Sequence, residues 1–484
     1  MVQSAAKRVG FFSKRRDMDM TTGSIPAKII RFAIPLLLGN LFQQLYNMVD
    51  TWVIGQTGIT EAYAAVGNVG PITNILIGFF LGLSTGASVV ISQYFGSGEG
   101  ENVKKAVHTA AALTVAASVL FTVIGVLMTP LILKAMLHAG SESFNQTVYD
   151  YAVTYLTIYF SGVSAMMVYN MCSGILRAVG DSTRPFVFLC VAALLNIALD
   201  LIFVFGFGLD VEGVALATII SQGASAILSV VSLLRTDSVV KIRVKEIRFD
   251  GKSLGKILKI GLPAGIQTAL TAFSNVFVQS YITGANGPAG YALSPEDVQA
   301  INMSAWTTYS KIDNFFFLPM QSIALSMTTF VGQNLGINNV ERAKKGTKVA
   351  WMLCTGTVLV FMVPLFIFAR PLARFFQDDQ VVVEIAVTLL HTLTPFYLFS
   401  CVNQTLLGSM RGAGNSTAPM IIMLANFVGM RQIYLFVMSN YISNDLLPIG
   451  LGYPFGWICC AITMAVYYFF FFDYSKYRIT GKQK

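Results

Sequence analysis

Long apolar runs dominate this chain and limit its fold more than any other feature of the sequence. Runs of about 20 apolar residues recur between short polar breaks such as GQTG and GDSTRP, a pattern typical of membrane-spanning helices. Only 12% of the 484 residues are charged, whereas soluble proteins have about 25%. A porin-like barrel would show alternating segments of about ten residues, which we do not find. We therefore predict an all-α integral membrane protein.

Twelve spans fit the apolar runs and the turn residues between them. They are 29–54, 62–94, 104–129, 150–175, 185–207, 212–234, 257–283, 298–331, 343–369, 383–408, 417–439 and 450–473. The connections are too short to hold a soluble domain. We expect a basic cytoplasmic tail at 1–28, a first lobe at 29–234, a basic cytoplasmic linker at 235–256, a second lobe at 257–473 and a cytoplasmic tail at 474–484. The linker is expected to be solvated, with an interfacial segment as the alternative.

Basic residues fall mainly on one side of this predicted topology. If the N-terminus is cytoplasmic, all but five of the 33 lysines and arginines lie at the cytoplasmic side. Three of the five lie outside, and two, Lys311 and Arg431, lie within spans. This asymmetry supports the number of spans and predicts that both termini are cytoplasmic in a plasma-membrane protein. It also assigns the net charge of +9 to the membrane surface, so the expected partner is anionic lipid and not nucleic acid.

The two halves of the chain are related by an internal duplication. RAVGDSTRP at 177–185 recurs as RGAGNSTAP at 411–419, and SQYFGSGEGENVKKA at 92–106 recurs as GQNLGINNVERAKKG at 332–346. The first and seventh spans also share a proline. Six spans per repeat give both halves the same orientation, so a pseudo-twofold axis along the membrane normal relates the two six-helix lobes. A cavity between the lobes and alternating access by rocking of the lobes are the expected consequences.

Polar residues occur inside two of the predicted spans, where a charge is costly. On the first span, Gln43, Asn47 and Asp50 form a polar stripe along one helix face. On the fifth span, Asn196 and Asp200 are four residues apart and share a face. These residues must face protein or water and not lipid.

The two aspartates and Thr218 of the sixth span have similar predicted depths in the outer half of the first lobe, at about 1.5 Å per residue. They can therefore converge. Two carboxylates close together in a low-dielectric site hold a proton or need a cation, and Asn and Thr oxygens would also suit Na⁺. The residues thus predict a site for H⁺ or Na⁺. The alternative is a set of satisfied polar groups that hold helices together.

Several of these segments together resemble a known transporter family. IPLLLGNLFQQLYNMVDTWVIGQ, STGASVVISQYFGSGE and the paired turns RAVGDST and RGAGNST are similar to sequences of the MATE family, the multidrug and toxic compound extrusion transporters. The resemblance covers nearly the whole chain after its N-terminal tail. It implies twelve spans in two lobes, and export of amphiphilic, often cationic, compounds in exchange for H⁺ or Na⁺.

One branch of that family has its cation site in the first lobe, and the resemblance extends to those residues. Asp50 matches the aspartate of span one, Asn196 and Asp200 match the pair on span five, and Thr218 matches the threonine on span six. Pro35 resembles the proline at which that branch bends its first helix. The other branch has carboxylates on spans seven and ten, which this sequence lacks apart from Glu384 at a helix start, so a site of that type is not expected.

The second lobe is basic where the first is acidic. Lys311 has Asp313 close by in the eighth span, and Arg431 lies in the eleventh; a functional charge and a structural ion pair are both open for them. We hypothesise that the two lobes move together when protonation of the acidic site bends span one and narrows the cavity. The expected cavity is lined by Gln43, Asn47, Gln267, Asn275, Asn302, Tyr309, Lys311 and Arg431.

The expected function is secondary active multidrug efflux by a monomer that needs no cofactor. The main alternative is a flippase for lipid-linked precursors or polysaccharide from the same superfamily. A channel and a receptor fit a duplicated bundle with an acidic pair less well. An enzyme is not expected, because there is no Ser-His-Asp, metal or phosphate-binding pattern at membrane depth. The three histidines, His108, His138 and His391, are too far apart in sequence for a zinc motif.

Overall fold

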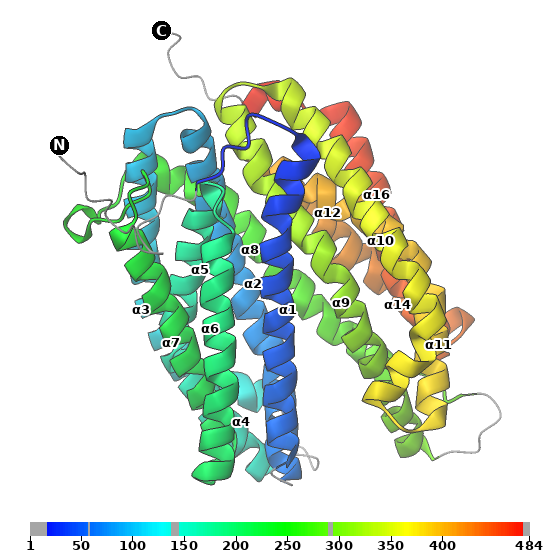
Figure 1. The fold of residues 1–484 in the computed structure, drawn as a ribbon. Coiled ribbons are helices and arrows are strands. Elements are labelled where there is room, and N and C mark those ends of the chain that lie inside the picture. The colour runs from blue at the N-terminus through cyan, green and yellow to red at the C-terminus, as the bar shows by residue number, and fades with distance from the viewer. Residues whose placement is uncertain (1–16, 57–58, 137–144, 289–293, 478–484) are drawn as a thin grey trace, which may run out of the picture. The chain divides into compact units, whose positions relative to one another are not determined.

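Helices form the whole framework of the protein in the computed structural model, which describes residues 17–56, 59–136, 145–288 and 294–477 (Figure 1). The α-helices are α1 (Ile25–Gln56), α2 (Thr60–Gly96), α3 (Gly100–Met136), α4 (Gln146–Ser161), α5 (Val163–Ala178), α6 (Thr183–Asp200), α7 (Val211–Arg235), α8 (Gly251–Thr283), α9 (Pro295–Gly336), α10 (Val340–Phe376), α11 (Gln380–Leu393), α12 (Tyr397–Gly412), α13 (Thr417–Leu424), α14 (Arg431–Val437), α15 (Leu446–Gly450) and α16 (Gly452–Val466). The short 3₁₀ and π segments are η1 (Leu201–Gly206), η2 (Val244–Glu246), η3 (Thr394–Phe396), η4 (Ala425–Met430), η5 (Met438–Ile442), η6 (Tyr467–Phe471) and η7 (Tyr474–Tyr477). His138 and the outer parts of both expected tails, 1–16 and 478–484, lie outside the described residues.

Most predicted spans correspond to helices that are long and apolar enough to cross a membrane. Ten helices of the described chain meet this requirement, and α4 with α5, which are bent by 45°, make an eleventh. The remaining predicted span, 257–283, corresponds to α8, which has 33 residues but is not among these candidates. Its middle contains Gln267, Thr271, Ser274 and Asn275. These side chains make α8 less apolar than the other spans, and they need partners inside the protein.

The bend between α4 and α5 lies at Gly162. A Cβ atom there would be 2.3 Å from Cγ2 of Ile219 in α7, which is too close for any side chain. The Gly162 N–H still donates to the Ile158 carbonyl at 3.2 Å, so the backbone remains bonded through the bend. The run predicted as one span, 150–175, is thus bent by 45° at this glycine, where the missing side chain leaves room for α7.

The chain divides into two compact units. Unit 1 comprises residues up to Met20, Leu38–Thr73 and Leu83–Leu258, and unit 2 comprises Thr21–Leu37, Asn74–Gly82 and the chain from Lys259 onward. The first part of α1 thus belongs to unit 2, and its second part, which carries Asp50, belongs to unit 1. The lobe boundaries inferred from the repeat, 29–234 and 257–473, stay a prediction.

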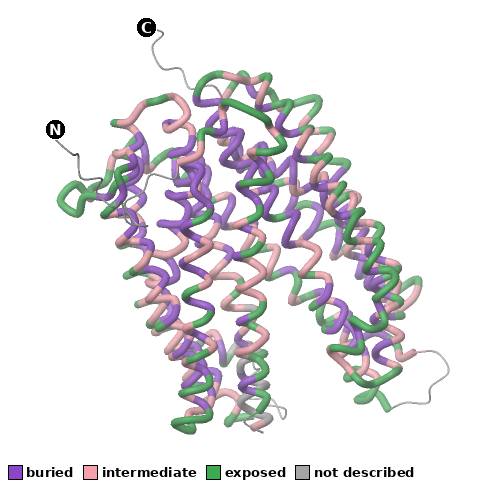
Figure 2. The backbone as a smooth tube through the Cα atoms, in the orientation of Figure 1, coloured by how far each residue is buried: buried purple, intermediate pink, exposed green. Residues whose placement is uncertain are grey.

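Apolar side chains cover much of the outside of several helices. Only 22% of the most apolar window of α10 and 28% of that of α3 is buried inside the protein. Figure 2 shows exposed positions along the length of α10, where Val360, Val363 and Ile367 are each more than half exposed. An apolar surface of this extent is the one expected for helices in contact with lipid.

The internal duplication is visible in matching backbone turns. Gly180 and Gly414, at equivalent positions of the two repeats, have φ values of +89° and +95°. Gly180 N–H donates to the Arg177 carbonyl at 2.9 Å, and Gly414 N–H donates to the Arg411 carbonyl at 2.8 Å. Glycine is favoured in this left-handed conformation. At Gly180 it also leaves room for the chain, because a Cβ atom would lie 2.3 Å from the Met18 carbonyl oxygen.

The second pair of repeated segments also folds alike. Gly98 and Asn338 have φ values of +74° and +59° in the turns before α3 and α10. Their N–H groups donate to the carbonyls of Phe95 and Leu335 at 3.2 and 3.0 Å. Asparagine is among the few residues that adopt this conformation readily, so the two sequences form the same turn.

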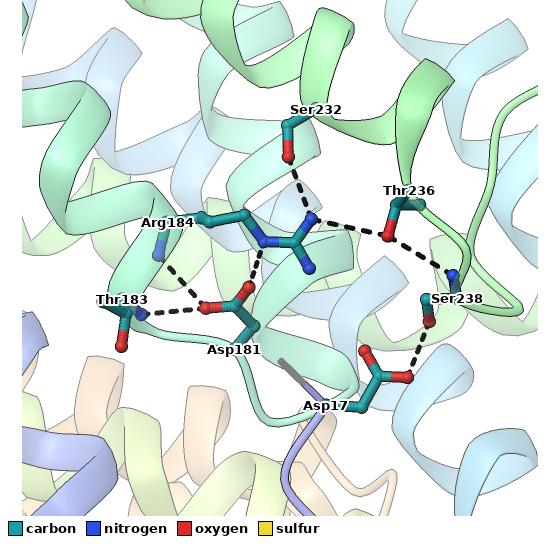
Figure 3. A network of polar contacts seen from close by, with 7 residues as sticks. All are labelled: Asp17, Asp181, Thr183, Arg184, Ser232, Thr236 and Ser238. Atoms are coloured by element: carbon teal, nitrogen blue, oxygen red, sulfur yellow. Dashed lines mark hydrogen bonds and ion pairs between the residues drawn. The ribbon is translucent and has the colours of Figure 1, made fainter. Parts of the chain in front are cut away.

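A buried polar network joins α6, α7 and the start of the linker in unit 1 (Figure 3). Asp181 accepts hydrogen bonds from the backbone N–H groups of Thr183 and Arg184 at 3.0 and 3.1 Å, and forms an ion pair with the Arg184 guanidinium. Arg184 also donates to the hydroxyls of Ser232 at 3.0 Å and Thr236 at 3.4 Å. Its side chain is 0% exposed. The ion pair of Asp181 and Arg184 is therefore buried. If one of the two residues were removed, water could not solvate the charge of the other.

Candidate functional site

Two acidic side chains meet in unit 1 near the ends of α1 and α6 that lie away from the linker. Asp50 is on the last part of α1, and Asp200 is the last residue of α6, where the chain passes into the π-helical segment η1. Their carboxyl groups are close enough to interact electrostatically. π-Helical turns often mark functional sites, since they change the direction of neighbouring side chains.

Several buried polar atoms of this site have no hydrogen-bond partner among the described residues. Asp50 Oδ1, both carboxylate oxygens of Asp200 and both amide atoms of Asn196 are buried without a hydrogen-bond partner. Asn196 and Asp200 are 1% and 0% exposed. Each unsatisfied buried polar group costs about 1–3 kcal/mol. A proton or a small cation would supply the missing interactions, so the donor set fits either ion.

Two tyrosines surround the carboxyl groups. Tyr46 and Tyr155 both interact electrostatically with Asp50, and Tyr155 also interacts with Asp200. The Tyr46 hydroxyl accepts a hydrogen bond from Gln222 at 3.4 Å. Neither tyrosine was predicted from the sequence. Tyr46 lies one helical turn before Asp50 and could have been found from that spacing, whereas nothing local connects Tyr155 to the site.

An apolar cluster packs around the same ends of the helices. Val53 and Ile54 of α1 are buried against Val204 of η1 and Val211 and Val214 of α7. Removal of water strengthens the interaction between nearby charges. By excluding water, the cluster increases the repulsion between the two carboxylates. It therefore also increases the stabilisation that a bound ion would provide.

Thr218 belongs to α7, and the structure gives it a local partner. Its hydroxyl donates to the Val214 carbonyl at 3.0 Å. Asn47 is exposed, and its carbonyl accepts a hydrogen bond from Thr51 at 2.9 Å. Gln43 hydrogen-bonds with Tyr46. The place of Thr218 in the ion site and of the other two residues in a cavity stays a prediction.

Pro35 lies inside α1, which runs as one continuous helix from Ile25 to Gln56. Pro263 occupies the corresponding position inside α8. A proline within a helix removes one backbone hydrogen bond and favours bending there. The role of Pro35 as the point at which α1 bends on ion binding stays a prediction.

Arg431 has a defined set of partners in unit 2. Its guanidinium donates to Ser274 Oγ and Asn275 Oδ1, both at 2.9 Å, and lies 4.8 Å from the centre of the Tyr453 ring. Arg431 is 3% exposed. Two polar side chains of α8 and the face of the Tyr453 ring therefore hold the buried guanidinium of Arg431 inside the unit.

Asp313 has two phenolic partners and is not paired with Lys311. Tyr309 donates to Asp313 Oδ1 at 3.1 Å, and Tyr397 donates to the same oxygen. Lys311 is exposed and lies 5.5 Å from the centre of the Phe376 ring. Residues two positions apart on a helix point to different sides, which explains why Lys311 and Asp313 do not form an ion pair. Tyr397 was not selected from the sequence, because it belongs to a distant span.

Gln267 and Asn302 bind other parts of unit 2. Gln267 accepts a hydrogen bond from Arg411 at 2.6 Å, and Asn302 donates to the Ala285 and Asn286 carbonyls at 2.9 and 3.3 Å. Both side chains are buried. These hydrogen bonds join helices and loops of the unit. The contribution of Gln267 and Asn302 to a substrate cavity stays a prediction.

The acidic pair has no counterpart in the second repeat. At the offset of the paired prolines, Asp50 corresponds to Val278, and at the offset of the paired turns, Asp200 corresponds to Tyr434. Val278 is fully buried in the apolar core of unit 2. The two halves thus share their turns but differ in charge at these positions.

We expect the replacement Asn196→Leu to separate stability from ion binding. Leucine removes two unsatisfied polar atoms, so the ion-free protein should become more stable by about 1–3 kcal/mol. The increase in melting temperature that a bound ion provides should become smaller. Tryptophan fluorescence during heating in detergent, with and without Na⁺ and at two pH values, measures both effects.

The matched control for this prediction is Asn302→Leu. Asn302 is equally buried but makes two hydrogen bonds, so its replacement should lower the melting temperature and leave the ion effect unchanged. An unchanged ion effect in Asn196→Leu would show that Asn196 is not a ligand.

Comparison with known proteins identifies the family. The sequence profile of the MatE family matches residues 35–202 and 297–436. The chain belongs to the MatE family. The resemblance drawn from the sequence is thereby confirmed, and one matched segment falls in each half of the duplication. The chain is a multi-pass membrane transporter and not an enzyme.

Relatives of this MatE protein match it over nearly their whole length. YoeA of Bacillus subtilis, a probable multidrug resistance protein, is 28% identical over 463 residues, which cover 93% of this chain and 94% of YoeA. NorM of Thermotoga maritima, also a probable multidrug resistance protein, is 28% identical over 438 residues, which cover 88% and 89% of the two chains. A solved transporter of the MOP superfamily from Pyrococcus furiosus superposes with a TM-score of 0.85 at 22% identity, over 94% of this chain and 97% of that one. The predicted fold class is confirmed by this likeness.

Proposed function

We propose that this MatE protein exports amphiphilic, often cationic, compounds across the plasma membrane in exchange for H⁺ or Na⁺. The observation that supports it most is the pair of interacting carboxyl groups, Asp50 and Asp200, with Asn196 one turn before Asp200 and with buried oxygens of both acids that have no hydrogen-bond partner among the described residues. The names of the relatives support export of drugs by the family. They do not favour the alternative of a lipid-linked precursor flippase.

The coupling follows from the charge of the site. When the site is empty, two neighbouring carboxylates repel each other in a low-dielectric environment, and a bound proton or Na⁺ removes that repulsion. The ion therefore binds one conformation more tightly than another and shifts the equilibrium between them. If substrate prefers the other conformation, each ligand weakens the binding of the other by the same factor.

The conformational change we propose is alternating access, with α1 bending at Pro35 when the acidic site is loaded. Both termini are then cytoplasmic, and the transporter works as a monomer surrounded by lipid. Lys311 and Arg431 would lie beside the substrate and respond to its charge. The hydrogen bonds of Arg431 to Ser274 and Asn275 would hold its guanidinium in place during this change.

The decisive experiment is ethidium efflux from proteoliposomes that contain the purified protein. A pH gradient and a Na⁺ gradient are imposed separately and together. We expect efflux to follow one of the two gradients, to saturate with ethidium, and to show counterflow. Efflux that ignores both gradients would contradict exchange, and turnover of a labelled lipid-linked precursor in the same vesicles would favour the flippase.

A further inference from the structure

His108 is a buried histidine at the linker end of unit 1, and its hydrogen bonds determine its charge. The ring Nδ1 lies 2.7 Å from the Lys104 carbonyl oxygen, and Nε2 lies 3.0 Å from the backbone nitrogen of Arg243 in the linker. A carbonyl only accepts and an amide N–H only donates, so Nδ1 carries the hydrogen and Nε2 is bare. This arrangement requires the neutral imidazole.

The charged groups around the ring come from α3 and from the linker. Glu246 Oε2 lies 3.8 Å from His108 Nε2, and the other oxygen of Glu246 accepts a hydrogen bond from the Arg243 guanidinium at 2.9 Å. Lys104 is in range of Glu246 from α3 and is itself paired with Glu101 at 2.7 Å. Lys105 also lies in range of Glu101. A protonated ring would therefore have a carboxylate within reach of Nε2.

The neighbouring acids keep their charge when the pH falls to mildly acidic values. The hydrogen bond from Arg243 holds the pKa of Glu246 below its usual range, and the hydrogen bonds from Lys104 and Ser253 do the same for the pKa of Glu101 and of Asp250. Histidine is the side chain that ordinarily changes charge between pH 5 and 8. Within this set, His108 is the group whose two ring nitrogens are both held by backbone partners, so its hydrogen bonds depend on whether Nε2 carries a hydrogen.

The linker is attached to α3 through His108 and the residue after it. The Thr109 hydroxyl accepts a hydrogen bond from the Asp250 N–H at 3.0 Å. At the other end, the Ile242 N–H donates to the Leu233 carbonyl at 3.0 Å, which ties the linker to the end of α7. The bond from Arg243 to His108 lies between these attachments. It is the one whose acceptor disappears when the ring gains a proton.

We propose that His108 and Glu246 form a proton-binding site that controls how the linker docks on α3. At neutral pH the bare Nε2 accepts the Arg243 N–H and the linker is docked. On acidification, a ring that gains a proton at Nε2 turns this hydrogen toward the Glu246 carboxylate, 3.8 Å away. The Arg243 N–H then loses its acceptor and the linker loosens. This site is separate from the Asp50 and Asp200 pair and does not depend on the proposed exchange.

Hydrogen exchange of the full-length protein in nanodiscs tests the proposal. Mass spectrometry follows the linker peptides between residues 237 and 250 from pH 8 to pH 5.5, with rates corrected for the intrinsic effect of pH. A single hydrogen bond contributes about 1 kcal/mol, so we expect exchange at Arg243 to become about fivefold faster between the highest and the lowest pH of the series. Protection that is independent of pH in the wild-type protein would overturn the proposal.

Two variants identify the groups that are responsible. In His108→Gln the side-chain oxygen can take the place of Nε2 as acceptor without gaining a proton, so protection should be constant across the pH range. In Glu246→Gln the hydrogen bonds of His108 with the backbone of Lys104 and Arg243 are kept, but the protonated ring loses its anionic partner. The change in linker protection should therefore move to lower pH. A wild-type transition in His108→Gln would show that another group is the sensor, and an unmoved midpoint in Glu246→Gln would show that Glu246 is not the partner of the protonated ring.

Discussion

Replacement of Asp200 by asparagine should lower ion-driven ethidium efflux by about 100-fold, which is near the upper range of coupling between two binding sites. The amide keeps the size of the side chain but cannot change its charge, so ion loading no longer alters the repulsion with Asp50. Asp50→Asn should have the same effect for the same reason. The measurement is initial efflux from proteoliposomes under the gradient that drives the wild-type protein.

Stability distinguishes this loss of coupling from misfolding. Each of the two variants removes one of two interacting carboxyl groups that both have buried oxygens, so the melting temperature of the ion-free protein at neutral pH should stay the same or rise. The control is Asp150→Asn on α4, because Asp150 is exposed and its side chain accepts a hydrogen bond from Gln146 one turn away. The control should transport normally. Wild-type efflux in Asp200→Asn would remove Asp200 from the coupling mechanism.

The second large effect is expected from Arg184→Ala at the linker end of unit 1. This change leaves the buried Asp181 carboxylate without its ion-pair partner, which typically costs about 3–5 kcal/mol. The hydroxyls of Ser232 and Thr236 also lose their donor. Thermal unfolding in detergent should therefore begin at a clearly lower temperature. Lys345→Ala, which breaks the exposed pair of Lys345 with Glu341, should have almost no effect.

The second repeat supplies a neutral version of the same turn and hence a rescue experiment. There Asn415 takes the place of Asp181, and Ala418 takes the place of Arg184. Asn415 Oδ1 accepts the Ala418 N–H at 3.2 Å, as Asp181 accepts the N–H of Arg184. The double variant Asp181→Asn, Arg184→Ala copies this arrangement and leaves no unpaired charge. It should recover at least about half of the lost stability. A double variant less stable than Arg184→Ala would refute this explanation.

Local sequence patterns predicted the helices and turns well where a single physical requirement determines the residues. The apolar runs gave nearly all spans, because a membrane requires long helices with apolar surfaces. The repeated turns were recognised because glycine at a left-handed position leaves a clear mark on the sequence. The break at Gly162 was missed, since its cause is the approach of Ile219 from a distant helix. α8 was expected as an ordinary span, although its polar side chains depend on partners such as Arg411 and Arg431.

In the candidate site, too, local sequence predicted some features, whereas others depend on contacts between distant segments. Spacing placed Asn196 and Asp200 on one face of a helix, and the cost of burying a charge made Asp50 a candidate site residue. No spacing rule connects Tyr155 to these carboxyls, or Tyr397 to Asp313, because these partners come from other spans. Periodicity describes one helix at a time and cannot state which faces of different helices meet.

By itself, the sequence determined that the chain is a duplicated helical membrane protein with acids placed at a cost in its first half. Both conclusions depend on local chemistry, namely the solubility of side chains in lipid and the period of a helix. The tertiary structure alone decided that Asp50 faces Asp200, that Arg431 is held by α8, and that His108 must be neutral to hold the linker. Those facts depend on packing between segments far apart in the chain, where small differences in side-chain shape select one pairing among many.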